Sequence, residues 1–185
     1  TGLEPMSNSL PTATLGRTDL PVTRLGHGAM EIRGGPRGRD ISDQQAGAIL
    51  NAVLDAGITY IDTSNDYGRS EELIGEFISG RRSEFFLATK CGCVPGGGRH
   101  EWTRENLFRG LNESLERLRT DYVDVMQLHN AGVEDCETGG VVQALEDMRS
   151  QGKVRWIGAS TPLPRLPTYI EWGVFDVFQI PYSAL

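Results

Sequence analysis

The chain has 185 residues, of which 38% are hydrophobic and 23% charged, a composition typical of one globular domain with its own core. Its 25 acidic and 18 basic residues give a net charge of −7, which argues against binding to nucleic acid or to an anionic membrane surface. No apolar stretch reaches the roughly 18 residues of a membrane span. The three cysteines, an odd number, do not form a disulfide framework, so we expect a cytoplasmic protein.

The N-terminal part predicts a tail and then a hairpin. Residues 1–11 carry no pattern of a regular element, so we expect a disordered tail ahead of one domain over residues 12–185. Residues 12–24 alternate loosely about Gly16-Arg17-Thr18-Asp19, which predicts an N-terminal β-hairpin. Val22–Met30 predicts the first strand of the main sheet, interrupted by two glycines.

The rest of the chain alternates short apolar runs, typical of buried strands, with helical patterns. This alternation predicts repeated βα units and an α/β fold with a parallel sheet. The further strands are predicted at Thr59–Asp62, Glu84–Lys90, Val123–His129, Val154–Ser160 and Phe175–Pro181. The helices are predicted from a capping box at Ser42–Gln45 to Gly57, over Ser70–Ile78, after an N-cap at Thr103, over Val141–Ser150 and, more weakly, over Leu163–Trp172.

Four polar residues follow the predicted strands at their carboxyl ends, and they carry the functional argument. Asp62, Lys90 and His129 each end an apolar run, while Tyr67 lies in the loop after the first of these runs. A lone Lys or Asp at a strand end is usually a surface residue or a cap. In a parallel sheet with βα connections, however, all four gather on the rim where such folds carry out their chemistry.

These side chains make a chemical set. A buried ammonium beside a tyrosine stabilises the phenolate that forms when the tyrosine donates its proton, and Lys90 can supply it. A buried lysine needs a counter-ion, which Asp62 can provide from the neighbouring strand. His129 can then hydrogen-bond a substrate oxygen that Tyr67 protonates.

Other motifs favour structural roles. Cys91-Gly92-Cys93 is a weak metal signal because no second pair of Cys or His follows nearby, so we expect no metal site. His27 and His100 lack an acidic or serine partner at useful spacing and are interpreted as structural. The glycines of Pro95–Arg99 match neither dinucleotide-binding fingerprint and indicate a loop.

Five motifs, in order, resemble the aldo-keto reductases from about Leu15 to the end of the chain. The motifs are Gly57-Ile58-Thr59-Tyr60-Ile61-Asp62-Thr63, Tyr67-Gly68-Arg69-Ser70-Glu71, Thr89-Lys90, Asp124-Val125-Met126-Gln127-Leu128-His129 and Gly152-Lys153-Val154-Arg155-Trp156-Ile157-Gly158-Ala159-Ser160. The resemblance implies a (β/α)8 TIM barrel that binds NADPH without a Rossmann domain and reduces aldehydes or ketones to alcohols.

The resemblance also assigns roles. It makes Tyr67 the general acid, tuned by Lys90 and Asp62, with His129 orienting a small-molecule carbonyl substrate. The implied cofactor-binding residues are Met30, Asp62, Ser160, Thr161 and Gln179. Thr161 stands where the family commonly has Asn, and the usual Pro-Asp after the histidine is replaced by Asn130-Ala131.

Six strands and five connecting helices make an incomplete barrel, with two βα units fewer than the implied fold. Those units carry most of the adenosine-phosphate site in the family, so we expect the 185 residues alone to bind NADPH weakly. Open sheet edges would also invite self-association. An alternative is a non-catalytic scaffold or binding subunit that a partner completes; retention of all four rim residues favours the enzyme.

Overall fold

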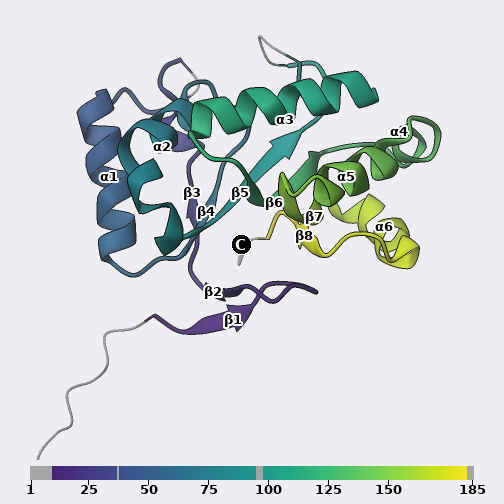
Figure 1. Ribbon diagram of the computed structural model, residues 1–185, viewed down its shortest axis with the longest axis horizontal. Helices are drawn as coiled ribbons and strands as arrows, with labels where there is room; N and C mark the ends of the chain where they lie inside the picture. The colour runs from purple at the N-terminus through teal and green to yellow at the C-terminus, as the bar shows by residue number, and fades with distance from the viewer. Residues whose placement is uncertain (1–9, 37, 95–97, 183–185) are drawn as a thin grey trace, which may run out of the picture.

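The computed structural model describes residues 10–36, 38–94 and 98–182. Its centre is a curved sheet of parallel strands, ordered as they occur along the chain (Figure 1). The strands are β3 (His27–Gly28), β4 (Tyr60–Asp62), β5 (Phe86–Cys91), β6 (Val123–His129), β7 (Val154–Ser160) and β8 (Val177–Gln179). The predicted α/β class with six parallel strands is therefore confirmed. No helix in the described ranges is long and apolar enough to cross a membrane.

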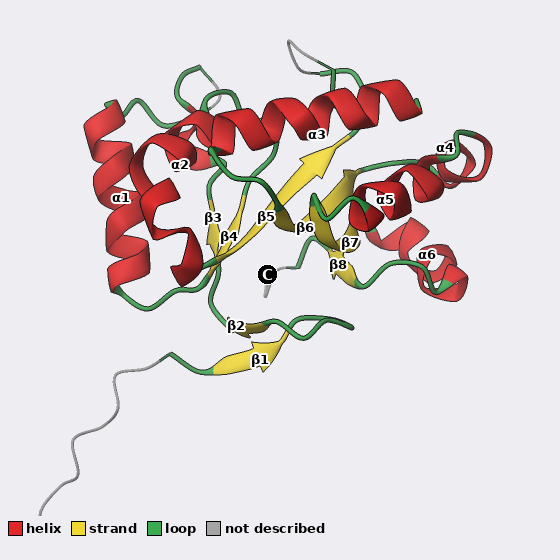
Figure 2. Cartoon of the chain, in the orientation of Figure 1, coloured by secondary structure: helices red, strands yellow, loops and turns green. Residues whose placement is uncertain are grey.

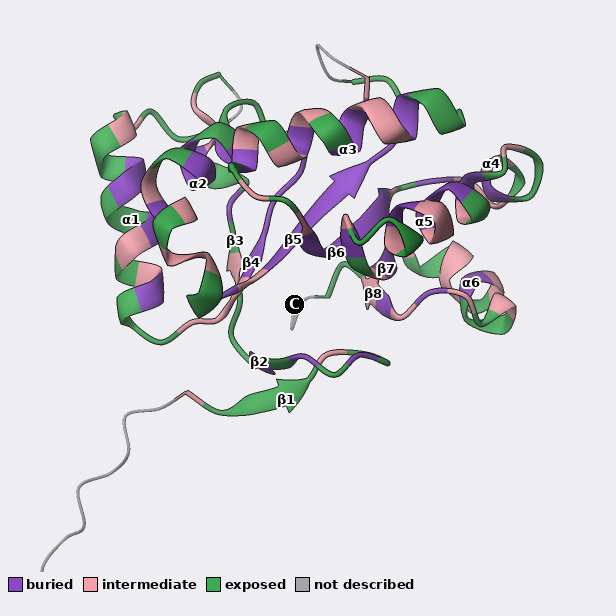
Figure 3. Ribbon diagram, in the orientation of Figure 1, coloured by how far each residue is buried: buried purple, intermediate pink, exposed green. Residues whose placement is uncertain are grey.

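Helices cover the convex side of this sheet (Figure 2). They are α1 (Asp43–Asp55), α2 (Ser70–Ile78), α3 (Arg104–Leu118), α4 (Val133–Thr138), α5 (Val141–Ser150) and α6 (Leu166–Trp172), with 3₁₀ turns η1 (Glu31–Arg33), η2 (Ser79–Glu84) and η3 (Leu163–Arg165). The predicted caps are present: Ser42 and Gln45 form a reciprocal capping box, and the Thr103 hydroxyl accepts from the Asn106 amide. The main core lies between helices and sheet, where most residues of β5, β6 and β7 are buried (Figure 3).

The predicted N-terminal hairpin, β1 (Thr12–Thr14) and β2 (Pro21–Thr23), lies at the amino ends of the strands (Figure 1). Leu20 and Val22 pack there against a second apolar cluster that includes Val125 and Val177. The Arg17 guanidinium also donates to two carbonyl oxygens just ahead of β8. The hairpin thus fills the interior of the curved sheet from below, opposite the rim.

Three details of the prediction are wrong. The first sheet strand is His27–Gly28 rather than Val22–Met30, because Thr23 and Thr59 each donate the backbone amide to the hydroxyl of the other instead of continuing a ladder. The sixth strand is also shorter, Val177–Gln179. The segment after His129 contains α4, at a place where the sequence pattern predicts no helix. The expected tail and the centre of the glycine-rich segment fall on residues 1–9 and 95–97, outside the described ranges.

Helices α2 and α3 approach each other closely where Gly75 of α2 meets the end of α3. A Cβ on Gly75 would overlap the Arg117 carbonyl oxygen and lie 2.9 Å from the Leu118 carbonyl carbon. We therefore expect Gly75→Ala to lower the free energy of unfolding by about 1–3 kcal/mol, the usual cost of overpacking. Urea denaturation measures this change. Gly80→Ala is the control, because its Cβ would meet open space; equal losses in both variants would contradict the prediction.

Candidate active site

The interior of the curved sheet has an apolar layer and a polar layer. Strand residues alternate between the two faces of a sheet, so every second residue of each strand points inward. The lower layer holds Tyr60, Phe86, Val125, Trp156 and Val177 beside the hairpin. Further along the strands, toward their carboxyl ends, the inward positions include the polar residues Asp62, Lys90, Gln127 and Gln179. This upper layer contains the candidate active site.

A buried ion pair occupies the centre of the upper layer. The Lys90 ammonium on β5 lies 2.6 Å from Asp62 Oδ2 on β4, and it also donates to the Thr63 carbonyl oxygen at 2.7 Å. The Lys90 side chain is only 1% exposed and that of Asp62 11%. A charge buried to this extent requires an opposite charge in contact, so each partner fixes the position of the other.

Two glutamines complete the environment of Asp62. Gln127 on β6 donates from Nε2 to Asp62 Oδ1 at 2.9 Å, and Gln179 on β8 donates to Oδ2 at 3.2 Å. The carboxylate can only accept, so both amides turn their nitrogen toward it. Their Oε1 atoms are buried and have no hydrogen-bond partner among the described residues. Each is an acceptor that a bound ligand could use.

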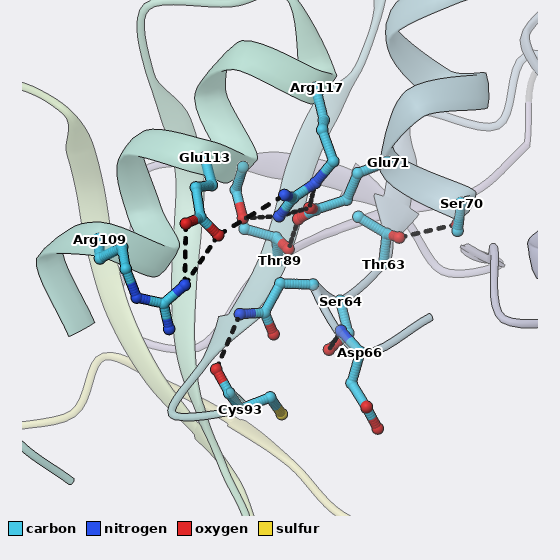
Figure 4. Close-up of polar contacts among 12 residues, drawn as sticks. Thr63, Ser64, Asp66, Ser70, Glu71, Thr89, Cys93, Arg109, Glu113 and Arg117 are labelled. Carbon is cyan, nitrogen blue, oxygen red and sulfur yellow. Dashed lines mark hydrogen bonds and ion pairs between the residues drawn. The ribbon is translucent and has the colours of Figure 1, made fainter. Parts of the chain in front are cut away.

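The loop that carries Tyr67 is fixed at both ends. The Ser70 hydroxyl donates to the Ala29 carbonyl oxygen at 2.8 Å, so its 2.8 Å contact with Thr63 must have the Thr63 hydroxyl as donor. The Tyr67 amide bonds to the Ser64 carbonyl oxygen at 3.0 Å. Figure 4 shows this loop beside the buried carboxylate of Glu71, which accepts from Thr89 and Arg117. These contacts hold Tyr67 at the rim.

The four predicted rim residues come together. The Lys90 ammonium lies over the Tyr67 ring, 4.8 Å from its centroid. The Tyr67 and His129 rings are 6.0 Å apart in an edge-to-face arrangement. With the Lys90–Asp62 pair, this places a phenol, a cation and an imidazole around one point at the carboxyl ends of the strands. Such a set can donate a proton to a ligand atom and hold that atom by a second hydrogen bond.

His129 is neutral and has a defined tautomer. Burial, followed by the positive charges of Lys90 and His100, lowers the pKa of His129 to about 4. The Ser64 hydroxyl and the Cys93 thiol each lie 3.3 Å from Nδ1. Burial raises the pKa of Cys93 to about 12, so the thiol keeps its proton and can donate it. We therefore assign Nδ1 as the acceptor and place the ring proton on Nε2.

The predicted cofactor residues divide into two groups. Ser160 on β7 pairs with His129 on one side and with Gln179 on the other, and the buried Thr161 donates its amide to the Gln179 carbonyl oxygen at 3.0 Å. These three residues line the same part of the rim. Met30 lies apart, beyond β3, and its side chain is 39% exposed. It is linked to the site through the neighbouring Ala29 amide, which donates to the Asp62 carbonyl oxygen.

Sequence reasoning missed four residues of this site, namely Gln127, Ser64, Cys93 and His100. Gln127 is the one neutral polar side chain in an apolar run. It stands two residues before His129, so the alternation of side chains along a strand places both on the same face, and this pattern could have identified it. Ser64 and Cys93 follow strands directly, but small polar residues are common there. His100 was interpreted as structural because it lacks an acidic or serine partner at useful spacing; its ring lies 5.7 Å from that of His129.

Comparison with known proteins shows which family the chain resembles. A family model described as "Aldo/keto reductase family" matches residues 24–185. The chain is 33% identical over 158 residues to the oxidoreductase YqkF of Bacillus subtilis, covering 82% of this chain and 49% of that protein. It is 31% identical over 192 residues to the NADH-specific methylglyoxal reductase of Escherichia coli, covering 92% and 58%. The chain thus spans about half the length of the curated relatives it matches.

The fold also matches a solved structure. The holo form of aldo-keto reductase AKR11C1 from Bacillus halodurans superposes with a TM-score of 0.83 at 28% identity, over 95% of this chain and 59% of that one. The curved sheet and its helices therefore correspond to part of a (β/α)8 barrel. The predicted fold class and the predicted family resemblance are both confirmed.

Removing the buried lysine should cost much stability. In Lys90→Met the Asp62 carboxylate loses its counter-ion, and breaking a buried pair in this way costs about 3–5 kcal/mol. Lys153→Met is the control, because this lysine bonds to Asn112 at the surface and its replacement should change stability by about 0.5 kcal/mol or less. Chemical denaturation gives both values. Replacing Asp62 by Leu in the Lys90→Met background should restore part of the loss; no restoration would show that the loss does not come from the unpaired Asp62 charge.

Proposed function

The chain belongs to the aldo/keto reductase family, and we propose on this basis that it reduces the carbonyl group of a small aldehyde or ketone to an alcohol. The observation that carries the proposal is the contact of a buried Lys90–Asp62 pair with the Tyr67 ring, opposite a neutral His129. These are the parts that proton transfer to a carbonyl oxygen requires.

Tyr67 is the proposed general acid. Its hydroxyl donates a proton to the carbonyl oxygen as the carbonyl carbon is reduced, and the phenolate left behind is stabilised by the Lys90 ammonium. The phenol then regains a proton from solvent, which completes the proton balance. Asp62 holds the ammonium in place, because their 2.6 Å contact offsets the desolvation of Lys90.

His129 is the proposed orienting residue. With its proton on Nε2, the neutral ring donates a hydrogen bond to the same carbonyl oxygen and polarises the carbonyl bond. The Ser64 hydroxyl and the Cys93 thiol, which lie at hydrogen-bond distance from Nδ1, stabilise that tautomer. A histidinium at this position would add a second positive charge beside Lys90, which the burial of the site disfavours.

The rim fits a nicotinamide cofactor. When bound, a reduced nicotinamide supplies the hydride that the carbonyl carbon receives. The buried, unpartnered Oε1 of Gln179 is an acceptor for a carboxamide N–H, and the Ser160 and Thr161 hydroxyls lie on the adjacent strand end. Met30, which follows β3, and Asp62, which ends β4, are the other two residues that we propose to face the cofactor. The family resemblance favours NADPH, whereas the E. coli relative is named as NADH-specific, so both forms belong in the assay.

The first test is Tyr67→Phe, assayed on the intact protein with small aldehydes and NADPH or NADH. Loss of the general acid should lower kcat by about 10²–10⁴-fold while the Kd of the cofactor stays near the wild-type value. Tyr60→Phe is the matched control. Tyr60 is also an interior tyrosine near Asp62, but burial raises its pKa well above the usual range and it belongs to the lower layer. A Tyr67→Phe enzyme with near-normal kcat would refute the assignment.

The second test concerns cofactor binding. Gln179→Leu removes the proposed carboxamide acceptor and should raise the Kd of the cofactor about tenfold, the worth of one buried hydrogen bond. Quenching of protein fluorescence on titration gives the Kd. Gln151→Leu, at the exposed end of α5, controls for loss of an amide elsewhere. Unchanged affinity in Gln179→Leu would place the nicotinamide away from β8.

A further inference from the structure

After β5, residues 92–94 pair with residues 99–101 in an antiparallel arrangement close to His129. Cys93 and His100 lie opposite each other in an antiparallel bridge. Backbone bonds from Val94 to Arg99 at 3.1 Å and from Glu101 to Gly92 at 2.8 Å frame this bridge on both sides. The backbone thus fixes the spacing between the Cys93 thiol and the His100 ring.

Side-chain packing fixes the direction of these groups. Gly92 has φ +102°, and a Cβ there would overlap the Trp102 ring, so the indole packs directly on the backbone. His100 stacks on that indole, with ring centroids 5.5 Å apart and an interplanar angle of 6°. The exposed His100 ring is thereby held edge-on to His129, at a centroid distance of 5.7 Å.

Three metal-ligating side chains meet at this point. A sulfur from Cys93 and one ring nitrogen each from His100 and His129 lie within 4.8 Å of one another. The Cys93 Sγ to His129 Nδ1 distance is 3.3 Å. Zn–S bonds near 2.3 Å and Zn–N bonds near 2.0–2.1 Å place the ligand atoms of a tetrahedral ion about 3.3–3.6 Å apart. One pair already meets this spacing, and the third ligand atom, on the exposed His100 ring, lies within 4.8 Å of the other two.

We propose that Cys93, His100 and His129 form a binding site for a zinc-like divalent cation, with one coordination position left open. One thiolate and two imidazoles are the ligand types that Zn²⁺ and Co²⁺ prefer over the oxygen ligands of Mg²⁺ or Ca²⁺. Cys91 takes no part. Its thiol is fully buried on the helix side of β5, where it donates to the Gln127 carbonyl oxygen.

The charges around the cluster suit a cation. On binding, the Cys93 thiol loses its proton to solvent and the sulfur ligates as thiolate, so the ion replaces a proton. The Asp66 carboxylate acts on both Cys93 and His129 as a negative charge, and its buried Oδ1 has no partner among the described residues. Lys90 opposes a cation here, but Asp62 neutralises it at 2.6 Å.

Cation binding would act on the proposed active site through one ring. A cation on His129 Nδ1 keeps the ring proton on Nε2, as Ser64 and Cys93 do without it, and makes that N–H a stronger donor. This consequence rests on the proposed function. The binding of the cation does not, because a spectrum of the bound ion measures it without any turnover.

The test is a titration of the reduced, chelator-free protein with Co²⁺, followed by absorption spectroscopy. One equivalent should produce a thiolate-to-cobalt charge-transfer band together with the intense visible bands of tetrahedral Co²⁺, and Zn²⁺ should displace both. Cys93→Ser should abolish the charge-transfer band. His100→Gln, a change at an exposed residue that leaves the core intact, should weaken Co²⁺ binding by at least about 10–100-fold, since losing even an outer partner of a metal ligand has that effect.

Two matched variants control for the residue types. Cys136→Ser removes a buried thiol near Tyr169, and His27→Gln removes a half-buried histidine on β3; both should bind Co²⁺ as the wild type does. Circular dichroism verifies that each variant is folded. Absence of the charge-transfer band in the wild-type protein, or its persistence in Cys93→Ser, would overturn the proposal. Unchanged affinity in folded His100→Gln would do the same.

Discussion

The structure of the site depends on one constraint, the burial of the Lys90 ammonium. A charge that is 1% exposed is tolerable only beside an opposite charge with further hydrogen bonds, and Asp62 provides the charge at 2.6 Å. That carboxylate in turn accepts from Gln127 and Gln179, so one side chain connects β4, β5, β6 and β8 across the interior of the sheet. These strands cannot slip relative to one another without leaving a buried charge or amide unsatisfied. The geometry required for chemistry is thus also the geometry that sets the register of the sheet.

The position of this polar layer follows from what lies beneath it. The hairpin and the inward apolar residues fill the lower interior, so the polar side chains occupy only the level next to the open end of the strands. Close packing at one glycine links the two layers. A Cβ on Gly158 would lie 2.8 Å from the Val177 carbonyl oxygen and 3.3 Å from Gln127 Cγ. Glycine there lets β8 approach β7 while the Gln127 amide reaches Asp62. Packing in the lower interior therefore controls how precisely the rim is held.

Strand-end reasoning predicted the rim because it uses a property of the whole fold: parallel strands linked by helices place their carboxyl ends together. It located Asp62, Lys90 and His129 without any tertiary information. Hydrophobicity alone could not reveal Gln127, whose partner is 65 residues away in sequence. The sequence pattern also gave the wrong bounds for the first strand, where hydrogen bonds between Thr23 and Thr59 replace the ladder. It did not predict α4, a short helix whose main local signals are one buried cysteine and the Asp135 carboxylate, which accepts from the Gly132 amide. The Thr23–Thr59 and Gln127–Asp62 contacts join residues far apart in the sequence, so no local pattern encodes the contacts themselves.

His129 shows how one side chain can satisfy two demands. Its neutrality comes from burial and from Lys90, so the same ion pair that supports Tyr67 also keeps the imidazole able to donate from Nε2. The other nitrogen then needs a partner, and the structure offers it Ser64, Cys93 and the approach of His100. A hydroxyl alone would suffice to hold the tautomer. The additional thiol and second imidazole exceed that need, and together they make the ligand set of a transition-metal ion rather than that of a simple hydrogen-bond acceptor. In this proposal, Nε2 of His129 serves the substrate and Nδ1 serves the cation.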